Sequence, residues 1–238
     1  MKLLWYGKLL TFFLIAGGQW GFAYTVDEIF HKFKAAYDTS KNFSAEFEET
    51  TLQDGNKSIA GGKLAFSKPN LLRKEYLSRE DSSQTVQLII LDGDYSWSYT
   101  PMLNQVNKMR WNNSNRNELL PGIGSSLDDV QENYDMRLVP DSIANKKGVY
   151  QIELSPKPHL LSQPADGIQH AREILEVWVQ SSDWLPVQFG YRSEREDGST
   201  LSVVVSLKKV RRDEEIAADA FRFVIPDDVE IIDLSSDE

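Results

Sequence analysis

The chain has 238 residues, of which 41% are apolar and 11% aromatic, so it can bury a sizeable core in one or two domains. Cysteine is absent, which excludes disulfides, cysteine-ligated zinc, a cysteine nucleophile and lipidation on a thiol. The 26 basic and 36 acidic residues give a formal charge of −10, which argues against nucleic acid as a partner because phosphates must be neutralised by Lys and Arg.

The first 23 residues predict a signal peptide. Lys2 and Lys8 precede an apolar run from Leu9 to Ala16, which is far shorter than the ~20 residues that span a bilayer. Small residues flank Phe22, so we expect cleavage after Ala23; an uncleaved anchor is the alternative. An exported chain without cysteine fits a bacterial periplasm.

A single helix is expected next. Thr25 and Glu28 have the spacing of a capping box, in which a hydroxyl and a carboxylate bind the first free amides of a helix. Apolar residues then recur at helical spacing and form one stripe, which consists of Val26, Ile29, Phe30, Phe33 and Tyr37. Such a stripe is typical of a face that packs on the core.

Strands dominate the remainder. Alternating or apolar runs predict strands near 43–48, 64–66, 71–77, 85–91, 149–154, 172–180, 186–192 and 201–210. Asp54-Gly55-Asn56 and Asp92-Gly93-Asp94 are turn signals, and Gly61-Gly62 indicates a bulge. Strands joined by short turns, without helices between them, predict one antiparallel sheet that curls on itself.

The segment 95–100 is the most informative of the expected strands. Tyr95, Trp97 and Tyr99 alternate with two serines and a threonine, so a period of two puts the rings on one face and the hydroxyls on the other. Pro101 ends the strand because it cannot donate to the ladder. The rings could belong to a sealed core or line a cavity, and the alternation does not decide between these.

Two segments, 112–129 and 155–170, interrupt the strands. In the first, Pro121, Gly122 and Gly124 forbid a long helix. Short helical turns over an apolar surface would fit, either as a lid or as an ordinary covering loop. The apolar residues of this segment are Leu119, Leu120, Ile123 and Leu127.

No catalytic or metal-binding motif is recognisable. His31, His159 and His170 lack metal-ligand spacing, and neither a G-x-S-x-G elbow nor a phosphate-binding glycine loop is present. We therefore expect no catalytic residue, no metal and no cofactor, and a protein that is not an enzyme. Carboxylate pairs for hydrolysis meet only in space, so that class stays open.

Several motifs follow one another in a specific order. The most specific block joins Asp92-Gly93, Trp97, Tyr99, Pro101 and Gln105-Val106. The others are Phe43-Ser-Ala-Glu-Phe47, residues 62–70, Leu72-Arg73, Glu75-Tyr76, Leu154 with Pro156, and Phe221-Arg-Phe223 followed by Pro226 and Val229. As an ordered set, these motifs resemble the periplasmic outer-membrane lipoprotein carriers, the LolA family.

The resemblance implies a mainly β (α+β) fold: a single antiparallel sheet curled into an incomplete β-barrel, with an N-terminal helix and short lid helices. Residues 24–238 would form one carrier domain, a half-barrel with a lid. The implied function is that of a periplasmic chaperone, which binds the acyl chains of lipoproteins in an apolar cavity. The implied partners are acylated lipoproteins, an inner-membrane ABC-type lipoprotein-releasing complex and an outer-membrane lipoprotein acceptor, with the carrier a monomer.

The physics of such a cargo agrees with this interpretation. Each methylene in water costs ~0.8 kcal/mol, so a chain of about twelve methylenes costs roughly 10 kcal/mol and cannot cross water unaided on a useful timescale. A carrier must cover the chains and also release them, which a half-barrel with a weakly packed lid could do.

The resemblance suggests which residues form the site. The candidate cavity lining consists of Phe43, Phe47, Leu64, Phe66, Leu72, Leu88, Ile90, Trp97 and Tyr99, with the inward parity of each strand left open. Leu119, Leu120, Ile123 and Leu127 would be lid contacts. Lys68 stands where the family commonly has an arginine that binds the lid, and lysine cannot make the same forked contact. Lys74 stands where relatives often have an aromatic residue, and Glu49 replaces a glutamine.

Three classes of function remain. The first is the lipoprotein carrier. The second keeps the fold as an envelope-stress sensor or lipoprotein acceptor, although the missing cysteine argues against a lipid-anchored acceptor. The third is a secreted hydrolase on a β scaffold.

Overall fold

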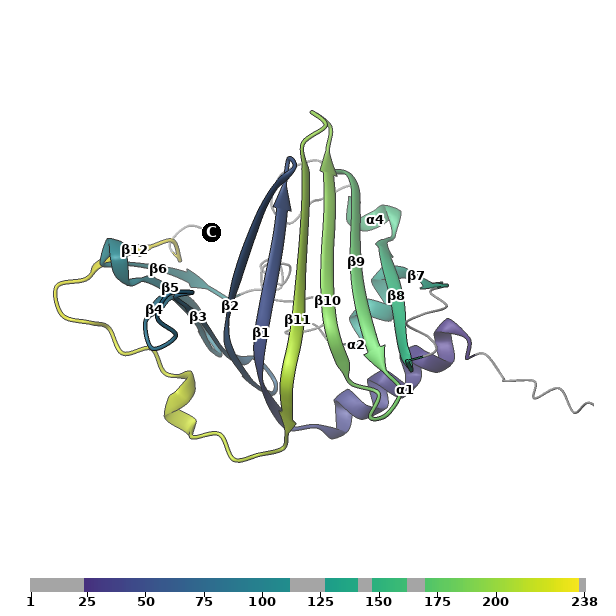
Figure 1. Cartoon of the computed structure of the whole chain (residues 1–238), viewed down its shortest axis with the longest axis horizontal. Helices are drawn as coiled ribbons and strands as arrows, with labels where there is room; N and C mark the ends of the chain where they lie inside the picture. The colour runs from purple at the N-terminus through teal and green to yellow at the C-terminus, as the bar shows by residue number, and fades with distance from the viewer. Residues whose placement is uncertain (1–23, 112–126, 141–146, 162–169, 236–238) are drawn as a thin grey trace, which may run out of the picture.

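The computed structural model describes residues 24–111, 127–140, 147–161 and 170–235, which form one curled sheet with helices at its side (Figure 1). The elements are α1 (Val26–Thr39), β1 (Asn42–Gln53), β2 (Asn56–Ser67), β3 (Leu71–Leu77), β4 (Thr85–Asp92), β5 (Tyr95–Thr100), the 3-10 helix η1 (Pro101–Leu103), β6 (Gln105–Arg110), α2 (Leu127–Asn133), β7 (Tyr134–Val139), β8 (Val149–Pro156), α4 (Pro158–Leu161), β9 (His170–Gln180), β10 (Pro186–Arg195), β11 (Thr200–Arg212), the 3-10 helix η3 (Ala218–Phe221) and β12 (Glu230–Asp233).

The described strands form a single twelve-stranded sheet in the order β12-β6-β5-β4-β3-β2-β1-β11-β10-β9-β8-β7. Every pairing is antiparallel except that of β12 with β6. The end strands β7 and β12 do not pair with each other, so the described sheet curls but does not close. The predicted fold class, an incomplete barrel made of one antiparallel sheet, is confirmed.

Turn chemistry fixes two of the hairpins. Asp54 and Gly55 both have positive φ, 48° and 83°, as a two-residue type I′ hairpin requires. At the next predicted turn, the Asp92 carboxylate accepts hydrogen bonds from the amides of Asp94 at 3.1 Å and Tyr95 at 2.8 Å, while Gly93 has a φ of 107°. Both predicted turns are confirmed.

Gly61-Gly62 does not form the predicted bulge, since β1 and β2 pair without interruption from Asn42 to Gln53. Gly62 instead allows a close approach. A Cβ on Gly62 would lie 1.8 Å from the carbonyl oxygen of Glu75 and 3.1 Å from the ring of Phe47. Because Gly62 has no side chain, β3 and the ring of Phe47 can both approach it closely.

Helix α1 begins as predicted. The Thr25 hydroxyl accepts a hydrogen bond from the amide of Glu28 at 3.2 Å, and the Glu28 carboxylate accepts one from the amide of Thr25 at 2.8 Å. The predicted stripe faces the sheet, because Ile29, Phe30 and Phe33 are buried in the main core.

Aromatic and cationic contacts anchor both ends of α1 to the sheet. Before its first residue, Tyr24 packs edge-on against Tyr150 and Trp184. Within the helix, Lys32 Nζ lies 4.9 Å from the ring centroid of Trp184. Near its end, Lys68 Nζ donates to the carbonyl oxygen of Tyr37 and lies 4.2 Å from the ring centroid of that tyrosine.

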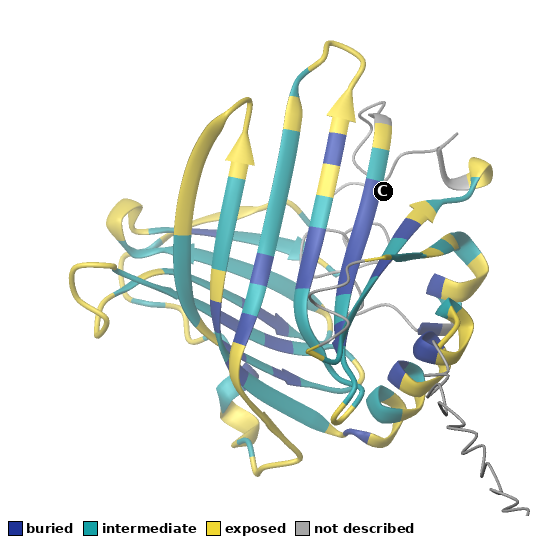
Figure 2. Cartoon of the chain, turned by 45° about the vertical axis from the view of Figure 1, so that its right-hand side comes forward, coloured by how far each residue is buried: buried dark blue, intermediate teal, exposed yellow. Residues whose placement is uncertain are grey.

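The sheet has two faces that are covered differently. We call the face on which α1 and α2 pack the inner face, and the opposite one the outer face. The main core joins α1 and α2 to the inner-face side chains of β1–β4 and β8–β11. Figure 2 shows buried stretches within these strands, whereas the hairpin tips are exposed. Strands β6, β7 and β12 have no counterpart in the sequence-based prediction.

Candidate functional site

Five of the predicted lining residues lie on the inner face. Phe43 on β1 pairs with Phe66 on β2, which pairs with Leu72 on β3, so these three side chains share one row. Phe47 and Leu64 belong to the same core, in which all of these residues except the half-buried Phe43 are buried. Together they form an apolar surface that faces α1.

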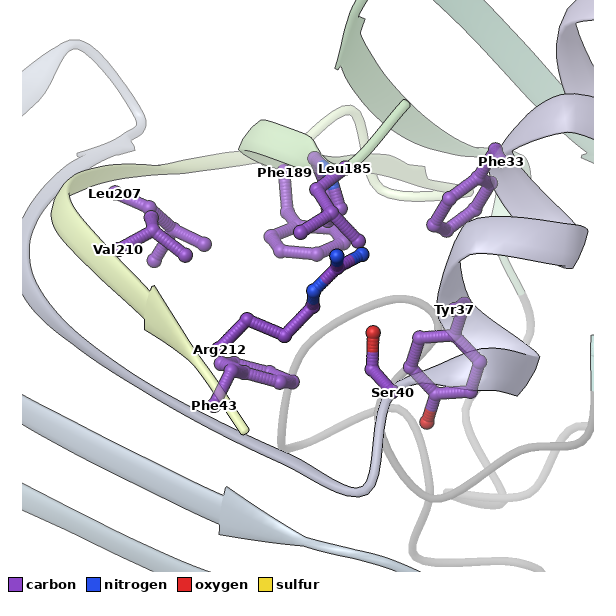
Figure 3. Close-up of a pocket in the computed structure, with 10 residues that line it drawn as sticks. Phe33, Tyr37, Ser40, Phe43, Leu185, Phe189, Leu207, Val210 and Arg212 are labelled. Carbon is purple, nitrogen blue, oxygen red and sulfur yellow. The ribbon is translucent and has the colours of Figure 1, made fainter. Parts of the chain in front are cut away.

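An apolar crevice opens at this surface beside the C-terminal end of α1 (Figure 3). The space between its atoms, with the open mouth included, is about 440 Å³, but only about 20 Å³ has room for a water-sized molecule, so the crevice is narrow. The lining consists of Phe33, Tyr37, Ser40, Phe43, Leu185, Pro186, Phe189, Leu207, Val210 and Arg212. Ser40 Oγ donates to the carbonyl oxygen of Ala36 at 2.8 Å, and Arg212 Nε lies 3.6 Å from Asp213 Oδ2, so the serine and the arginine of the lining are both engaged.

The sequence identified little of this crevice. Phe189 and Leu207 fall on strands that were expected, but only Phe43 was named as a lining residue. Leu185 and Val210 line the crevice with the end of α1 because the sheet curls. The sequence predicted a curled sheet, but no local pattern reports which side chains the curl brings to the end of α1, so these residues could not be assigned before the structure.

The other four predicted lining residues lie on the outer face. Leu88 pairs with Glu75 and Tyr99, and Ile90 pairs with Arg73 and Trp97, so all four predicted residues point away from the row that contains Leu72. They therefore cannot share a cavity wall with the inner-face residues.

The C-terminal segment packs on this aromatic part of the outer face. The ring of Phe223 stacks on Trp97 at 5.3 Å and lies 6.0 Å from Tyr99, between ring centroids. Arg73 donates to the carbonyl oxygen of Ala220 at 3.5 Å. Trp97 Nε1 also donates to Asp92 Oδ2 at 2.7 Å. The aromatic face of β5 is thus a packing surface for the segment that contains η3.

The inner face of β5 carries hydroxyls. Ser98 pairs with Ile89 on one side and Asn107 on the other, and Gln87 donates to Ser98 Oγ at 3.2 Å. Asn107 in turn accepts from Gln105 at 3.0 Å. The inner face is therefore largely apolar over β1 and β2 and largely polar over β5 and β6.

A charged cluster stands where the apolar and polar parts meet. Lys74 Nζ lies 2.7 Å from Glu49 Oε2, and the Tyr76 hydroxyl donates to the same oxygen at 2.9 Å. Burial lowers the pKa of Lys74, and the opposite charge of Glu49 resists that change. Burial also raises the pKa of Tyr76. Two of the three residues that depart from the family pattern, Glu49 and Lys74, are thus partners in space.

The predicted lid residues are described only in part. Leu127, the first residue of α2, is buried in the main core together with Val130. Leu119, Leu120 and Ile123 lie outside the described residues. Lys68, at the position predicted to bind the lid, contacts Tyr37 of α1.

Among the described residues, no group of three or more His, Asp or Glu side chains is arranged to hold a metal ion. No helix in the same part of the chain is long and apolar enough to cross a membrane.

Comparison with known proteins identifies the family. Residues 38–163 match the family described as outer membrane lipoprotein carrier protein LolA. An outer-membrane lipoprotein carrier protein of Xylella fastidiosa (strain Temecula1) is 27% identical over 199 residues, which are 80% of this chain and 79% of that protein. One of Glaesserella parasuis is 31% identical over 88 residues, 36% of this chain and 40% of that protein.

Similar solved structures include an uncharacterised conserved protein of Thermus thermophilus, at 14% identity and a TM-score of 0.49, with 87% of this chain and 98% of that one covered. A LolA superfamily protein of Nitrosomonas europaea has 14% identity and a TM-score of 0.40, with 84% of this chain and 99% of that one covered. The family match spans more than half of the sequence, and on that ground this chain belongs to the LolA family of outer-membrane lipoprotein carrier proteins.

Proposed function

We propose that this protein is a periplasmic chaperone that binds the acyl chains of lipoproteins against its inner face. It would receive them from an inner-membrane ABC-type lipoprotein-releasing complex and deliver them to an outer-membrane lipoprotein acceptor. Residues 1–23 would direct export and be removed after Ala23, which leaves 24–238 as the carrier domain. The protein would act as a monomer, without catalysis or a cofactor.

The observation that carries the proposal is the apolar inner face with a crevice at its edge. Phe47, Leu64, Phe66 and Leu72 are buried against the helices of the same face. An acyl chain that took the place of those helices would find the same apolar surface, since burial of apolar area is not directional. The crevice beside Phe43 supplies a point of entry with an apolar lining.

The placement of side chains limits the proposed lining. We assign acyl-chain contact to Phe43, Phe47, Leu64, Phe66 and Leu72, with Phe189, Leu207 and Val210 added from the crevice. Leu88, Ile90, Trp97 and Tyr99 are left out because they lie on the outer face.

A matched pair of substitutions tests the proposal. Val210 lines the crevice and is 37% exposed, whereas Val86 on β4 is 44% exposed and is not among the residues that line the crevice. Val210→Glu puts a carboxylate into the crevice at a position that can stay hydrated, so the fold is expected to survive. Val86→Glu makes the same change elsewhere.

The measurements are release of lipoproteins from spheroplasts and native mass spectrometry of protein purified from the periplasm. We expect wild type and Val86→Glu to release lipoproteins and to carry an acylated partner. Val210→Glu should lose at least roughly tenfold in release, because a bound acyl chain would cover the carboxylate and an unpaired buried charge costs a few kcal/mol. A wild-type protein that releases no lipoprotein and carries no acylated mass would refute the proposal. Binding of acyl ligands without release would instead fit the sensor hypothesis.

A further inference from the structure

The cluster of Glu49, Lys74 and Tyr76 has a polar composition that the apolar carrier surface does not require. The side chain of Lys74 is 5% exposed and that of Glu49 is 17% exposed. Lys74 Nζ also lies 4.9 Å from the ring centroid of Phe47 and 4.6 Å from that of Tyr76. An ammonium group is therefore enclosed by a carboxylate and two aromatic rings.

Stability does not explain this arrangement. Removing two charges from water costs several kcal/mol for each ion, and apolar residues of similar volume are often as stabilising as a buried ion pair. The neighbours Phe47 and Leu64 are apolar and buried, so apolar residues would fit the same surroundings. A buried ion pair among apolar residues of a proposed binding surface is a candidate for ligand recognition.

The hydrogen bonds of the cluster leave capacity on both charged groups. Lys74 and Tyr76 both bind Glu49 Oε2, and within the described residues Glu49 Oε1 makes no hydrogen bond. Lys74 has three N–H donors, and Glu49 is the only acceptor that the described part of the chain offers it. A ligand could thus both donate to the carboxylate and accept from the ammonium.

The position of the cluster gives such a ligand an orientation. Across the sheet, Lys74 on β3 pairs with Leu64 on β2, toward the apolar part of the inner face, and with Ile89 on β4 in the other direction. The same row of paired residues continues into Ser98 on β5 and Asn107 on β6. A molecule whose acyl chains cover the apolar part would have its polar end at Lys74 and Glu49.

We propose that Glu49, Lys74 and Tyr76 form a polar subsite that binds the head of an acylated ligand bearing an ester carbonyl beside an ammonium or amide N–H. The ester oxygen would accept from Lys74, and the nitrogen group would donate to Glu49 Oε1. A free fatty acid offers only acceptors and would meet the negative charge of Glu49. This inference rests on the proposed function and deepens it, because it selects acylated lipopeptides over single fatty acids.

The test uses the double variant Glu49→Gln/Lys74→Met, which removes both charges together and so leaves no uncompensated ion. Glu48 and Lys208 provide the matched control: they form a 3.1 Å pair one residue along β1, with side chains 51% and 58% exposed. Glu48→Gln/Lys208→Met makes the same exchange on the exposed side of the strand.

Two probes are compared on the folded variants, a dipalmitoylglyceryl-cysteine lipopeptide with a free amino terminus and palmitate, each in competition with a fluorescent apolar dye. We expect the charge-removing variant to lose about tenfold in affinity for the lipopeptide, as for one lost charge-assisted hydrogen bond, and to bind palmitate as well as wild type or better. The control variant should match wild type with both probes.

The outcomes separate the two claims. If wild type binds both probes and Glu49→Gln/Lys74→Met keeps the full preference for the lipopeptide, the subsite is refuted and the apolar carrier surface stands. If wild type binds neither probe, the proposed function fails and the subsite fails with it. An equal loss in the control variant would also refute the subsite, because the effect would then not depend on where the ion pair lies in the fold.

Discussion

On the outer face, one arginine holds a buried carboxylate across two strands. Arg192 on β10 donates through Nε to Glu176 Oε2 and through Nη2 to Glu176 Oε1, both at 3.0 Å. Gln151 donates to the same Oε1 at 2.8 Å. Gly190 leaves room for this carboxylate, since a Cβ there would lie 2.9 Å from Glu176 Oε2. A forked contact of this kind matches the planar guanidinium and not an ammonium.

Arg192→Met should lower the free energy of unfolding by about 2–3 kcal/mol, because it leaves Glu176 charged and buried with the amide of Gln151 as its remaining side-chain donor among the described residues. Chemical denaturation measures this change, and Arg192→Lys should recover part of the loss. Lys208→Met removes a partner from an exposed pair and should cost under about 1 kcal/mol. Equal effects of the two changes to methionine would show that the forked contact adds nothing.

Lys68 makes contacts with α1 that the sequence did not predict. It binds the end of α1 through the carbonyl oxygen and the ring of Tyr37, beside the crevice. Lys68→Met should therefore loosen α1 and lower the free energy of unfolding by about 1–2 kcal/mol. Hydrogen exchange should become faster in the last turns of α1 than in its capped first turn; unchanged protection throughout α1 would contradict the assignment.

At the scale of elements, the sequence predicted local structure well. The capping box, the stripe on α1, the two tight turns and the alternation in β5 all depend on neighbours within a few residues, and each appears in the structure. Strands β6 and β12 lack a local signal of this kind. β12 is a short edge strand that pairs in parallel with β6, which lies far from it in the sequence.

The alternation of residues along β4 and β5 could not show which side chains point to the inner face and which to the outer face. Both faces of β4 are apolar, since Ile89 and Leu91 face the helices while Leu88 and Ile90 lie on the outer face. A strand covered on both sides gives no period-two signal that distinguishes a cavity wall from a packing surface. The stacked ring of Phe223 shows that Trp97 lies on a packing surface, but Phe223 is remote from Trp97 in sequence.

The outer placement of Trp97 gives a fluorescence prediction. Binding of an acyl ligand should change the emission of wild type and of Trp97→Phe by the same amount, since Trp97 does not face the proposed ligand. Phe223→Ala should shift the emission contributed by Trp97 to longer wavelength, because it removes the ring stacked on the indole. A ligand-induced change that disappears in Trp97→Phe would place the indole in the binding site.

At the scale of the whole molecule, two partly buried tyrosines, Tyr37 and Tyr134, make stability depend on pH in alkali. Burial raises the pKa of Tyr37 and that of Tyr134 to about 12, from an unfolded value near 10. Below pH 10 both states hold the phenolic protons. Between about pH 10 and 12 the unfolded chain releases them and the folded protein retains them, so the free energy of unfolding falls as pH rises.

The slope should be at most about 1.4 kcal/mol per pH unit for each of the two tyrosines. Tyr37→Phe should make the curve shallower above pH 10 while leaving its slope near neutral pH unchanged. Denaturant titrations at a series of pH values measure both. A curve for Tyr37→Phe parallel to that of wild type up to pH 12 would contradict the raised pKa.

In the described sheet, the end strands β7 and β12 do not pair with each other, and this has a mechanical consequence. In a closed barrel, strand number and stagger fix the circumference, so the interior cannot widen without breaking backbone hydrogen bonds. Here the radius of curvature can change through small adjustments of twist between neighbouring strands, with every ladder intact. Swelling of the interior is then opposed mainly by side-chain contacts such as those of α1 and α2 with the sheet. A carrier built on this sheet would accommodate acyl chains of different width, at a cost set by its side-chain contacts and not by its backbone.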